Sequence, residues 1–296
     1  MQKLLVTGAS GFLGWNLCQL ARSEWEVVGT YDRQQIEISG VEIQQLDLTD
    51  LDRVAQEIDR IAPDVVIHTA AASSPNFCQS HSAQSYQINV VASDRLARIC
   101  ASAQIPFVFT STDLVFDGTQ PPYTETAPVS PINIYGTQKV AAEQAILSAY
   151  PQAAICRMPL MFGMTPPTAS SFIQPWITAL RSQASLQLFT DEFRTPVSAV
   201  TAAQGLLMAI NIPGILNLGG GERVSRYEFG KLLAEVFEFD ASLLAPISQQ
   251  DLPMAAPRAA DVSLDSTKAI GLGYAPLSLR QELTTISAQS KIGYQS

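Results

Sequence analysis

Three glycines near the amino terminus have the spacing of a phosphate-binding turn. They occupy positions 8, 11 and 14 of the segment VTGASGFLG, where a strand-like apolar run passes into a helix-like one. At Gly8 a Cβ would obstruct the turn, Gly11 allows a diphosphate to approach the backbone, and Gly14 allows close packing of helix on strand. The free N–H groups and positive dipole of the helix start would attract phosphate. We therefore predict a dinucleotide site here, with a tight turn that binds no ligand as the alternative.

A carboxylate and a guanidinium stand side by side at the end of the second predicted strand. Asp32 can accept hydrogen bonds from the adenosine ribose hydroxyls, which favours NAD. Arg33 can instead pair with a 2′-phosphate, which favours NADP, or it can be an ordinary solvated side chain. Together the two residues favour use of both cofactors, and the sequence leaves the preference open.

A tyrosine and a lysine in the segment SPINIYGTQKVAAE form a second candidate group. Tyr135 and Lys139 lie four residues apart where an exposed loop passes into a helix-like stretch, so their side chains would share one helix face. Such a pair on its own is more often a surface contact than a reactive site. Its meaning depends on the elements that surround it.

Strand-like and helix-like segments alternate through the first half of the chain. The predicted strands are short, and several lack polar alternation, as expected for strands buried on both faces: 3–8, 26–31, 41–47, 64–71, 106–112 and 153–158. The predicted helices lie at 12–23, 51–62, 84–103 and 135–150. This alternation implies parallel strands joined by right-handed crossovers, so we predict an α/β fold with a doubly wound, Rossmann-type sheet.

The regular alternation weakens after about residue 158. A proline-rich loop at 163–171 precedes a strand, loop and helix pattern at 185–210, and 214–220 could add a further strand to the main sheet. An amphipathic helix is predicted at 225–239, with Ser225 as its N-cap and Glu228 at the capping-box spacing.

These patterns predict two domains of unequal size. The dinucleotide-binding domain would comprise 1–158, with later returns at about 185–220 and 260–275. The smaller, discontinuous substrate-binding lobe would comprise 159–184, 221–259 and 276–296. We expect this lobe to cover the carboxyl ends of the strands, where ligands bind in such folds.

Composition limits the class of protein. Of the 296 residues, 47% are hydrophobic and 15% charged, which is enough apolar material for a substantial core. The net charge of -9 disfavours nucleic acid and anionic membranes as partners. The four cysteines form no CxxC pair, so we expect buried thiols rather than a zinc site or a disulfide framework. Because no apolar run could span a bilayer and no signal peptide precedes the first strand, we predict a soluble cytoplasmic protein.

The motifs taken together resemble those of the extended short-chain dehydrogenase/reductases. They are the glycine segment, LDLTD at 46–50, HTAAAS at 68–73, STDLVFDG at 111–118 and YGTQK at 135–139. STDLVFDG, PPYTE and SPINIYG are most similar to the dTDP-4-dehydrorhamnose reductase branch, as are ILNLGGGERVSRYEFGKLLAE and ADVSLDSTKAIGLGY later in the chain. The resemblance covers nearly the whole chain. It implies an NAD(P)H-dependent reductase of a 4-keto-6-deoxy nucleotide sugar, nominally dTDP-4-dehydrorhamnose giving dTDP-L-rhamnose.

Transferred residue by residue, the catalytic residues of this family fall on Thr112, Tyr135 and Lys139. Reduction of a ketone places negative charge on its oxygen, and Tyr135 would donate a proton there. The Lys139 ammonium would favour the phenolate and would also hold the nicotinamide ribose. Thr112 would hydrogen-bond the substrate oxygen and orient it.

The resemblance also implies cofactor contacts beyond the glycines. Asp47 and Leu48 match positions beside the adenine, and Asn89 matches an asparagine with either a packing or a cofactor-side role. The remaining matched positions are Ser10, Phe12 and Leu13 in the glycine segment, Thr69, Ala70 and Ala71 along the diphosphate and nicotinamide ribose, and Met158, Pro159 and Leu160 beside the nicotinamide. His68 is expected at a buried strand end without a chemical role.

The sequence departs from the branch at two positions near the sugar. Leu114 stands where a tyrosine is common, and Leu160 stands where an aromatic residue is common. Their side chains remove stacking surface and a hydroxyl from the pocket, so the sugar preference could change while the hydride chemistry is kept. Arg194 and Arg258 are candidates to clamp the substrate diphosphate, with solvated loop arginines as the alternative.

Two other functions are compatible with these residues. A nucleotide-sugar epimerase or dehydratase would keep the same three catalytic residues and hold NAD+ tightly, and a dehydratase would carry acids beside Thr112, where Asp113 is followed by Leu114. The branch also resembles the regulatory β-subunit of methionine adenosyltransferase, a non-catalytic binding partner that keeps a dinucleotide site. We predict NADP or NAD as cofactor, a nucleotide sugar as ligand, a possible homodimer and no metal site.

Overall fold

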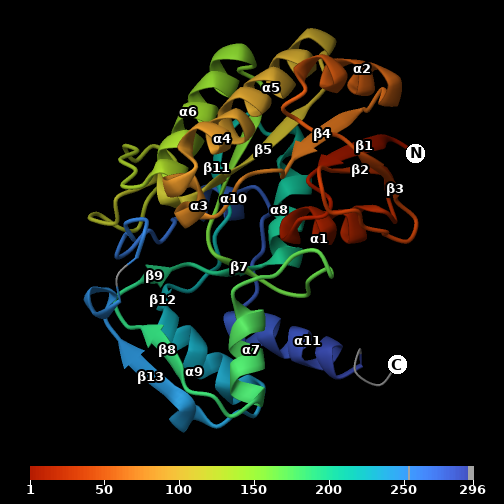
Figure 1. Ribbon diagram of the computed structural model, residues 1–296. Helices are drawn as coiled ribbons and strands as arrows, with labels where there is room; N and C mark the ends of the chain where they lie inside the picture. The colour runs from red at the N-terminus through yellow and green to blue at the C-terminus, as the bar shows by residue number, and fades with distance from the viewer. Residues whose placement is uncertain (253, 293–296) are drawn as a thin grey trace.

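The computed structural model describes residues 1–252 and 254–292. Within them the centre is a seven-stranded sheet with the order β11-β6-β5-β4-β1-β2-β3 (Figure 1). Its strands are β1 (Lys3–Thr7), β2 (Glu26–Tyr31), β3 (Glu42–Gln45), β4 (Val65–His68), β5 (Phe107–Thr112), β6 (Ala154–Met158) and β11 (Gly214–Asn217). All neighbouring strands run parallel. The chain moves outward from β1 to β3 and returns beside β1 as β4, which confirms the predicted doubly wound fold.

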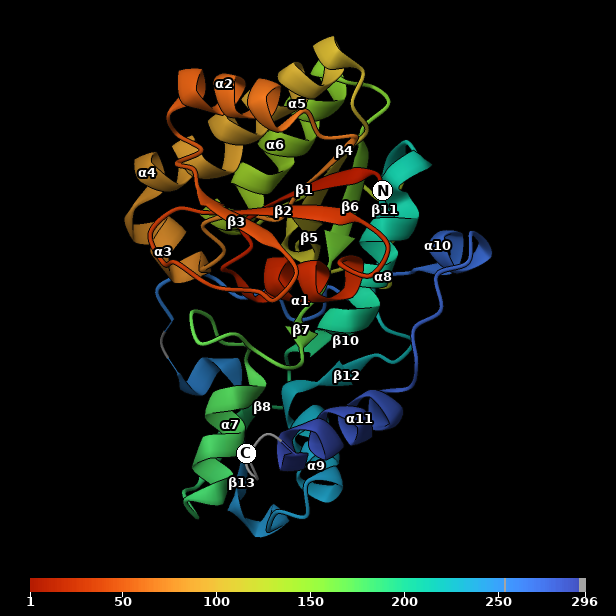
Figure 2. The same cartoon turned by 90° about the vertical axis from the view of Figure 1, so that its right-hand side faces the viewer.

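Helices cover both faces of the sheet, as Figure 2 shows. The layer on one face contains α2 (Leu51–Ile61), α5 (Ala92–Ala103) and α6 (Ile134–Ala149), and the layer on the other contains α1 (Phe12–Ala21) and α8 (Ala199–Met208). Successive strand residues belong to opposite layers, because Leu4 packs in the core with α1 and Leu5 packs in the core with α2. Burial on both sides explains why these strands are apolar without alternation.

The helix predicted at 84–103 is interrupted near its start. α4 (Ser82–Tyr86) passes through one π-helical turn, η1 (Gln87–Val91), into α5. Asn89 in this turn is buried; its Oδ1 accepts from the Ala72 N–H at 2.9 Å and its Nδ2 donates to Gln138 Oε1 at 2.9 Å. The side chain therefore links the backbone after β4 to α6, which is a packing contact.

A second lobe lies beyond the carboxyl ends of the strands (Figure 1). Its parallel strand pair joins β8 (Leu186–Phe189) to β13 (Leu244–Ile247), and α7 (Ile173–Arg181) and α9 (Arg226–Val236) pack beside it with α11 (Leu279–Ile292). α9 begins with the predicted capping box, in which Ser225 accepts from the Glu228 N–H and the Glu228 side chain accepts from the Ser225 N–H.

Short elements join the two parts of the chain. Two-residue strands pair β7 (Met161–Phe162) with β10 (Val197–Ser198), and β9 (Phe193–Arg194) with β12 (Val224–Ser225). The other short elements are α3 (Pro75–Ser80), η2 (Asp113–Val115), η3 (Ala209–Asn211), η4 (Ala241–Leu243), η5 (Gln249–Asp251) and α10 (Thr267–Gly271).

The strand pairing corrects one detail of the predicted domain division. The strand expected near 185, as the start of a return to the dinucleotide-binding domain, is β8, and it pairs with β13 of the second lobe. Later in the chain, α8 packs against α1 on one face of the main sheet, and β11 adds the predicted further strand to that sheet by pairing with β6. The remaining boundaries of the two domains stay a prediction.

Several buried side chains behave as the sequence indicated. All four cysteines are free, buried thiols. His68 contacts the hydroxyls of Thr7 and Ser93, at 2.6 and 2.9 Å, and burial lowers its pKa to about 3. It is therefore a neutral core residue. Across the described residues, no helix is both long and apolar enough to cross a membrane.

A buried ion pair attaches α6 to the centre of the sheet. The Glu143 carboxylate accepts hydrogen bonds from Arg157 of β6, from Nε at 3.0 Å and Nη2 at 2.8 Å. It also accepts from the Ser111 hydroxyl of β5 at 2.5 Å. Glu143 lies two helical turns beyond Tyr135 on the same face of α6. The ion pair of Glu143 with Arg157 therefore fixes the position of α6 relative to the strand ends.

We expect Glu143→Gln to destabilise the protein by about 3–5 kcal/mol, because Arg157 would keep its charge in the core without a charged partner. Urea denaturation measures the difference. The ion pair between Glu235 of α9 and Arg280 of α11 supplies the control, since Glu235→Gln removes an exposed pair and should change stability little. Similar losses in the two variants would contradict the anchoring role of Glu143.

Candidate active site

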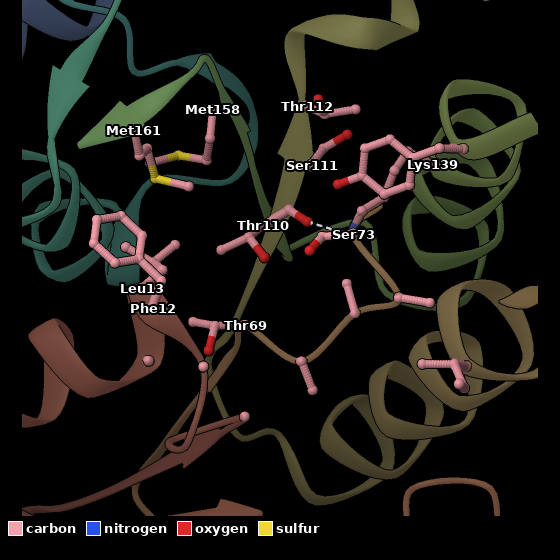
Figure 3. Close-up of a pocket in the computed structure, with 18 of the residues that line it drawn as sticks. Phe12, Leu13, Thr69, Ser73, Thr110, Ser111, Thr112, Lys139, Met158 and Met161 are labelled. Carbon is pink, nitrogen blue, oxygen red and sulfur yellow. Dashed lines mark hydrogen bonds between the residues drawn. The ribbon is translucent and has the colours of Figure 1, made fainter. Parts of the chain in front are cut away.

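A cleft of about 570 Å³ opens at the carboxyl ends of β1, β4, β5 and β6. Residues of the second lobe complete its wall. The predicted site residues that line it are Gly8, Ser10, Gly11, Phe12, Leu13, Gly14, Asp32, Asp47, Leu48, Thr69, Ala70, Ala71, Thr112, Leu114, Tyr135, Lys139, Met158, Pro159, Leu160, Arg194 and Arg258. Figure 3 shows Phe12 and Leu13 on one side of this space and Lys139 on the other. Residues from distant parts of the chain are thus brought to one cavity.

The glycine segment has the close packing that its spacing predicted. Gly8 adopts a φ of +78°, and a Cβ there would lie 2.7 Å from the Ala70 Cα. A Cβ on Gly14 would lie 2.2 Å from the Gly8 carbonyl oxygen, so the first turn of α1 rests directly on the end of β1. No side chain caps this helix start. The segment therefore presents backbone to the cleft, as binding of an anion at a helix amino terminus requires.

Asp32 and Arg33 are placed differently relative to the cleft. Asp32 lines the cleft, whereas Arg33 lies outside the lining with its side chain 75% exposed. The Arg33 Nε lies 3.2 Å from Asp32 Oδ2, so the guanidinium pairs with the carboxylate beside it. The Asp47 carboxylate accepts from the Thr49 N–H and hydroxyl, at 2.8 and 2.7 Å, and thus shapes the turn that lines the cleft.

Two elements, β5 and α6, bring the predicted catalytic residues together. Thr112 ends β5, while Tyr135 and Lys139 lie in the first two turns of α6, which begins where the Asn133 side chain accepts from the Gly136 N–H at 2.9 Å. Lys139 is only 1% exposed, and its Nζ donates to the Thr110 carbonyl oxygen at 2.7 Å (Figure 3). Its ammonium also lies 4.3 Å from the centre of the Phe109 ring.

Burial governs the proton affinities of this group. It raises the pKa of Tyr135 well above its ordinary value, and negative charge on Asp113 and Cys78 acts in the same direction, while a hydrogen bond with Thr112 opposes the shift. Burial lowers the pKa of Lys139 to about 7, against the opposing charges of Glu143 and Cys78. Near neutral pH the phenol therefore carries its proton and can donate it.

The second lobe contributes charged residues that sequence reasoning had not assigned. Glu192 and Arg226 line the cleft with Arg194 and Arg258. The Glu192 Oε1 lies 3.1 Å from Arg226 Nε and 3.4 Å from Arg194 Nη2, so one buried carboxylate holds two guanidiniums. One sequence signal was present: Arg226 is the first residue of α9, where a positive charge opposes the helix dipole. Asp113, which follows Thr112, also lines the cleft.

Residues 1–291 match the family model described as the RmlD substrate binding domain. The chain belongs to this family. Because the match spans the sheet and the second lobe, the RmlD family relation covers both walls of the cleft, and it confirms the resemblance seen in the motifs.

Relatives within and around the RmlD family differ in their described roles. The probable low-salt glycan biosynthesis reductase of Haloferax volcanii is 31% identical and aligns over 96% of each chain. The methionine adenosyltransferase 2 subunit beta of Rattus norvegicus is 30% identical over 92% of this chain and 83% of its own. A solved dTDP-4-dehydrorhamnose reductase of Bacillus anthracis in complex with NADP is 22% identical, covers 98% of this chain and 100% of its own, and has a TM-score of 0.85. This last match shows the shared fold.

The contact between Gly136 and η2 offers a test of how this RmlD-family chain positions Tyr135. A Cβ on Gly136 would lie 2.1 Å from the Leu114 carbonyl oxygen, so Gly136→Ala must displace the start of α6. We expect a loss of about 1–3 kcal/mol in the free energy of unfolding, measured with urea. Gly221→Ala is the control, because nothing lies within 4 Å of a Cβ there. A Gly136→Ala variant as stable as the control would show that the helix start is not tightly held.

Proposed function

We propose that the chain is an NAD(P)H-dependent reductase of a 4-keto-6-deoxy nucleotide sugar, nominally one that converts dTDP-4-dehydrorhamnose to dTDP-L-rhamnose. The observation that carries this proposal is the meeting of a protonated, buried phenol at Tyr135 with the glycine segment in one cleft. A proton donor and a dinucleotide cradle are the two parts that reduction of a ketone needs. Family membership and the 31% identical glycan biosynthesis reductase also support it.

The residues of the cleft fit a dinucleotide cofactor. The cradle between Gly8 and Gly14 is one that added Cβ atoms would fill, and its backbone would hold the diphosphate. Asp32 would accept from the adenosine ribose, and Lys139 would hold the nicotinamide ribose. When bound in the reduced form, this group supplies the hydride. The NADP complex of the Bacillus anthracis reductase supports the same assignment.

The protein's own residues would manage charge at the ketone oxygen. Tyr135 would give its proton to that oxygen as negative charge develops there, and the Lys139 ammonium would stabilise the phenolate that remains. Lys139 is already fixed by the Thr110 carbonyl, so little reorganisation is needed at the moment of transfer. The Thr112 hydroxyl would hold the carbonyl at the correct distance from the phenol.

The residues that the second lobe contributes to the cleft favour a diphosphate-linked sugar as the ligand. Arg194, Arg226 and Arg258 outnumber the carboxyl groups of Glu192 and Asp113 that face them, and the Arg258 Nε is buried without a hydrogen-bond partner among the described residues. A diphosphate would supply the missing acceptors. Leu114 and Leu160 line the same cleft, and their apolar side chains suit the methyl group of a 6-deoxy sugar.

A second candidate function is that of a non-catalytic regulatory subunit. The 30% identity with the methionine adenosyltransferase subunit favours it. Both functions use a dinucleotide site, so binding of the cofactor alone does not separate them. Turnover of a nucleotide sugar would support the first, and a stable complex with a methionine adenosyltransferase, without turnover, would support the second.

When the protein is supplied with dTDP-4-dehydrorhamnose and NADPH or NADH, we expect the cofactor to be oxidised. The measurement is the loss of absorbance of the reduced nicotinamide. We expect Tyr135→Phe to lower kcat by about 10²–10⁴-fold, because the proton donor is removed while the ring is kept. The cofactor should still raise the melting temperature of this variant, since its cradle is unchanged.

The control for this substitution is Tyr86→Phe, which removes a hydroxyl from an exposed tyrosine of α4. It should leave turnover unchanged. Full activity in Tyr135→Phe would exclude the phenol as the acid. No turnover with either cofactor by the folded wild-type protein would overturn the proposed substrate.

A further inference from the structure

Asp113 is a buried carboxyl group with one unmatched oxygen. It follows Thr112, opens η2 and is only 3% exposed, yet it lines the cleft. Its Oδ1 accepts from the Thr112 hydroxyl at 3.1 Å. Its Oδ2 has no hydrogen-bond partner among the described residues, and the Nε of Arg194 lies 3.5 Å away. Buried polar atoms in native proteins are usually hydrogen-bonded, so this oxygen calls for an explanation.

The Thr112 hydroxyl has a single proton to give. It already accepts from the Leu114 N–H at 3.2 Å. When Asp113 is ionised, the carboxylate is the strongest nearby acceptor and takes that proton, because hydrogen bonds to charged groups are the stronger ones. When Asp113 is protonated, its own O–H can donate to the Thr112 oxygen, and the threonine proton is then free for the Tyr135 oxygen, with which Thr112 also forms a hydrogen bond, or for a substrate oxygen in the cleft.

We propose that Asp113 is a positioning residue that sets the direction in which Thr112 donates, so that neutral Asp113 turns the threonine proton toward the substrate carbonyl oxygen. The inference rests on the proposed function, because the carbonyl is the ketone of that reaction. It assigns Asp113 a role through Thr112 and does not require the carboxyl group to touch the substrate.

Burial and the neighbouring charges together set the pKa of Asp113. Burial raises its pKa to about 6, and this effect outweighs the cations of Arg194, from β9, and Arg226, from α9. The Thr112 hydrogen bond also favours the ionised form, whereas Glu192 disfavours it. The neutral form is therefore well populated at mildly acidic pH.

Neutral Asp113 also affects the second proton donor. The phenol of Tyr135, on α6, faces the same carboxyl group, and negative charge on Asp113 raises the tyrosine pKa. Protonation of Asp113 removes that charge, which makes Tyr135 a stronger acid. One protonation thus frees the threonine proton and eases loss of the tyrosine proton.

The coupling can be tested without any substrate, through the pH dependence of stability. A carboxyl group whose pKa is raised on folding favours the folded state below its ordinary value of 3.8, and that contribution is lost as pH rises through about 6. The melting temperature of Asp113→Asn should therefore rise relative to that of the wild type as pH increases across this range, and the difference should level off above about 6. The pH at which the difference levels off reports the titration of Asp113 in the folded state.

Thr112→Val then tests whether the threonine is the partner. Loss of its hydroxyl removes a donor to the ionised carboxylate, so the pH at which the difference levels off, measured in this background, should rise by about one unit. Thr110→Val is the matched control, since the Thr110 hydroxyl donates to the His68 carbonyl and the levelling pH should not move. An unchanged levelling pH in Thr112→Val would overturn the proposal.

The pH dependence of kcat/KM provides a second test of the proposal. The amide of Asp113→Asn can donate to Thr112 at every pH, so the ratio of its kcat/KM to that of the wild type should rise as pH increases above about 6, by up to tenfold per unit. A ratio independent of pH would overturn the proposed role. If the wild type turns over no nucleotide sugar, the proposed function fails, and the stability experiments still decide whether Asp113 and Thr112 are coupled.

Discussion

The site depends on one face of α6 being held, fully buried, against the ends of the central strands. Tyr135, Lys139 and Glu143 recur every four residues along that face. Glu143 fixes the helix through Arg157, and Lys139 fixes it through the Thr110 carbonyl of β5. Exclusion of water from this contact shifts the proton affinities of the tyrosine and the lysine, so the same burial that holds the helix also prepares its chemistry.

The two walls of the cleft are built in different ways. The wall that fits a dinucleotide is mostly backbone, because Gly8 and Gly14 bring β1 and α1 into contact and leave no room for side chains. The wall formed by the second lobe is made of charged side chains, in which Glu192 holds Arg194 and Arg226 by ion pairs. A backbone cradle tolerates little change, whereas a wall of side chains can change its ligand by substitution. This difference suits a family whose members share a fold but differ in their described roles.

Asp113 links these walls. Its carboxyl group accepts from Thr112 on the sheet side and faces Arg194 on the side of the second lobe. A ligand anion that draws Arg194 toward itself would weaken the ion pair at the unmatched oxygen and favour the neutral carboxyl group. Occupation of the diphosphate subsite would then prepare the proton donors, which is one way for binding energy remote from the reacting atoms to act on them.

Local sequence determined the parallel sheet, the glycine segment and the helical spacing of Tyr135 and Lys139, because these depend on residues close together in the chain. Apolar runs such as β5 and β6 were recognisable since both faces of each strand are buried. The tertiary structure alone decided which distant charges meet. Arg226 and Glu192 are 34 residues apart in the chain, and no local pattern indicates their ion pair. The pairing of β8 with β13 was likewise missed, since a short apolar strand does not specify its partner. Asp113 was visible in the sequence, but its unmatched oxygen arises from burial by segments that only the fold brings together.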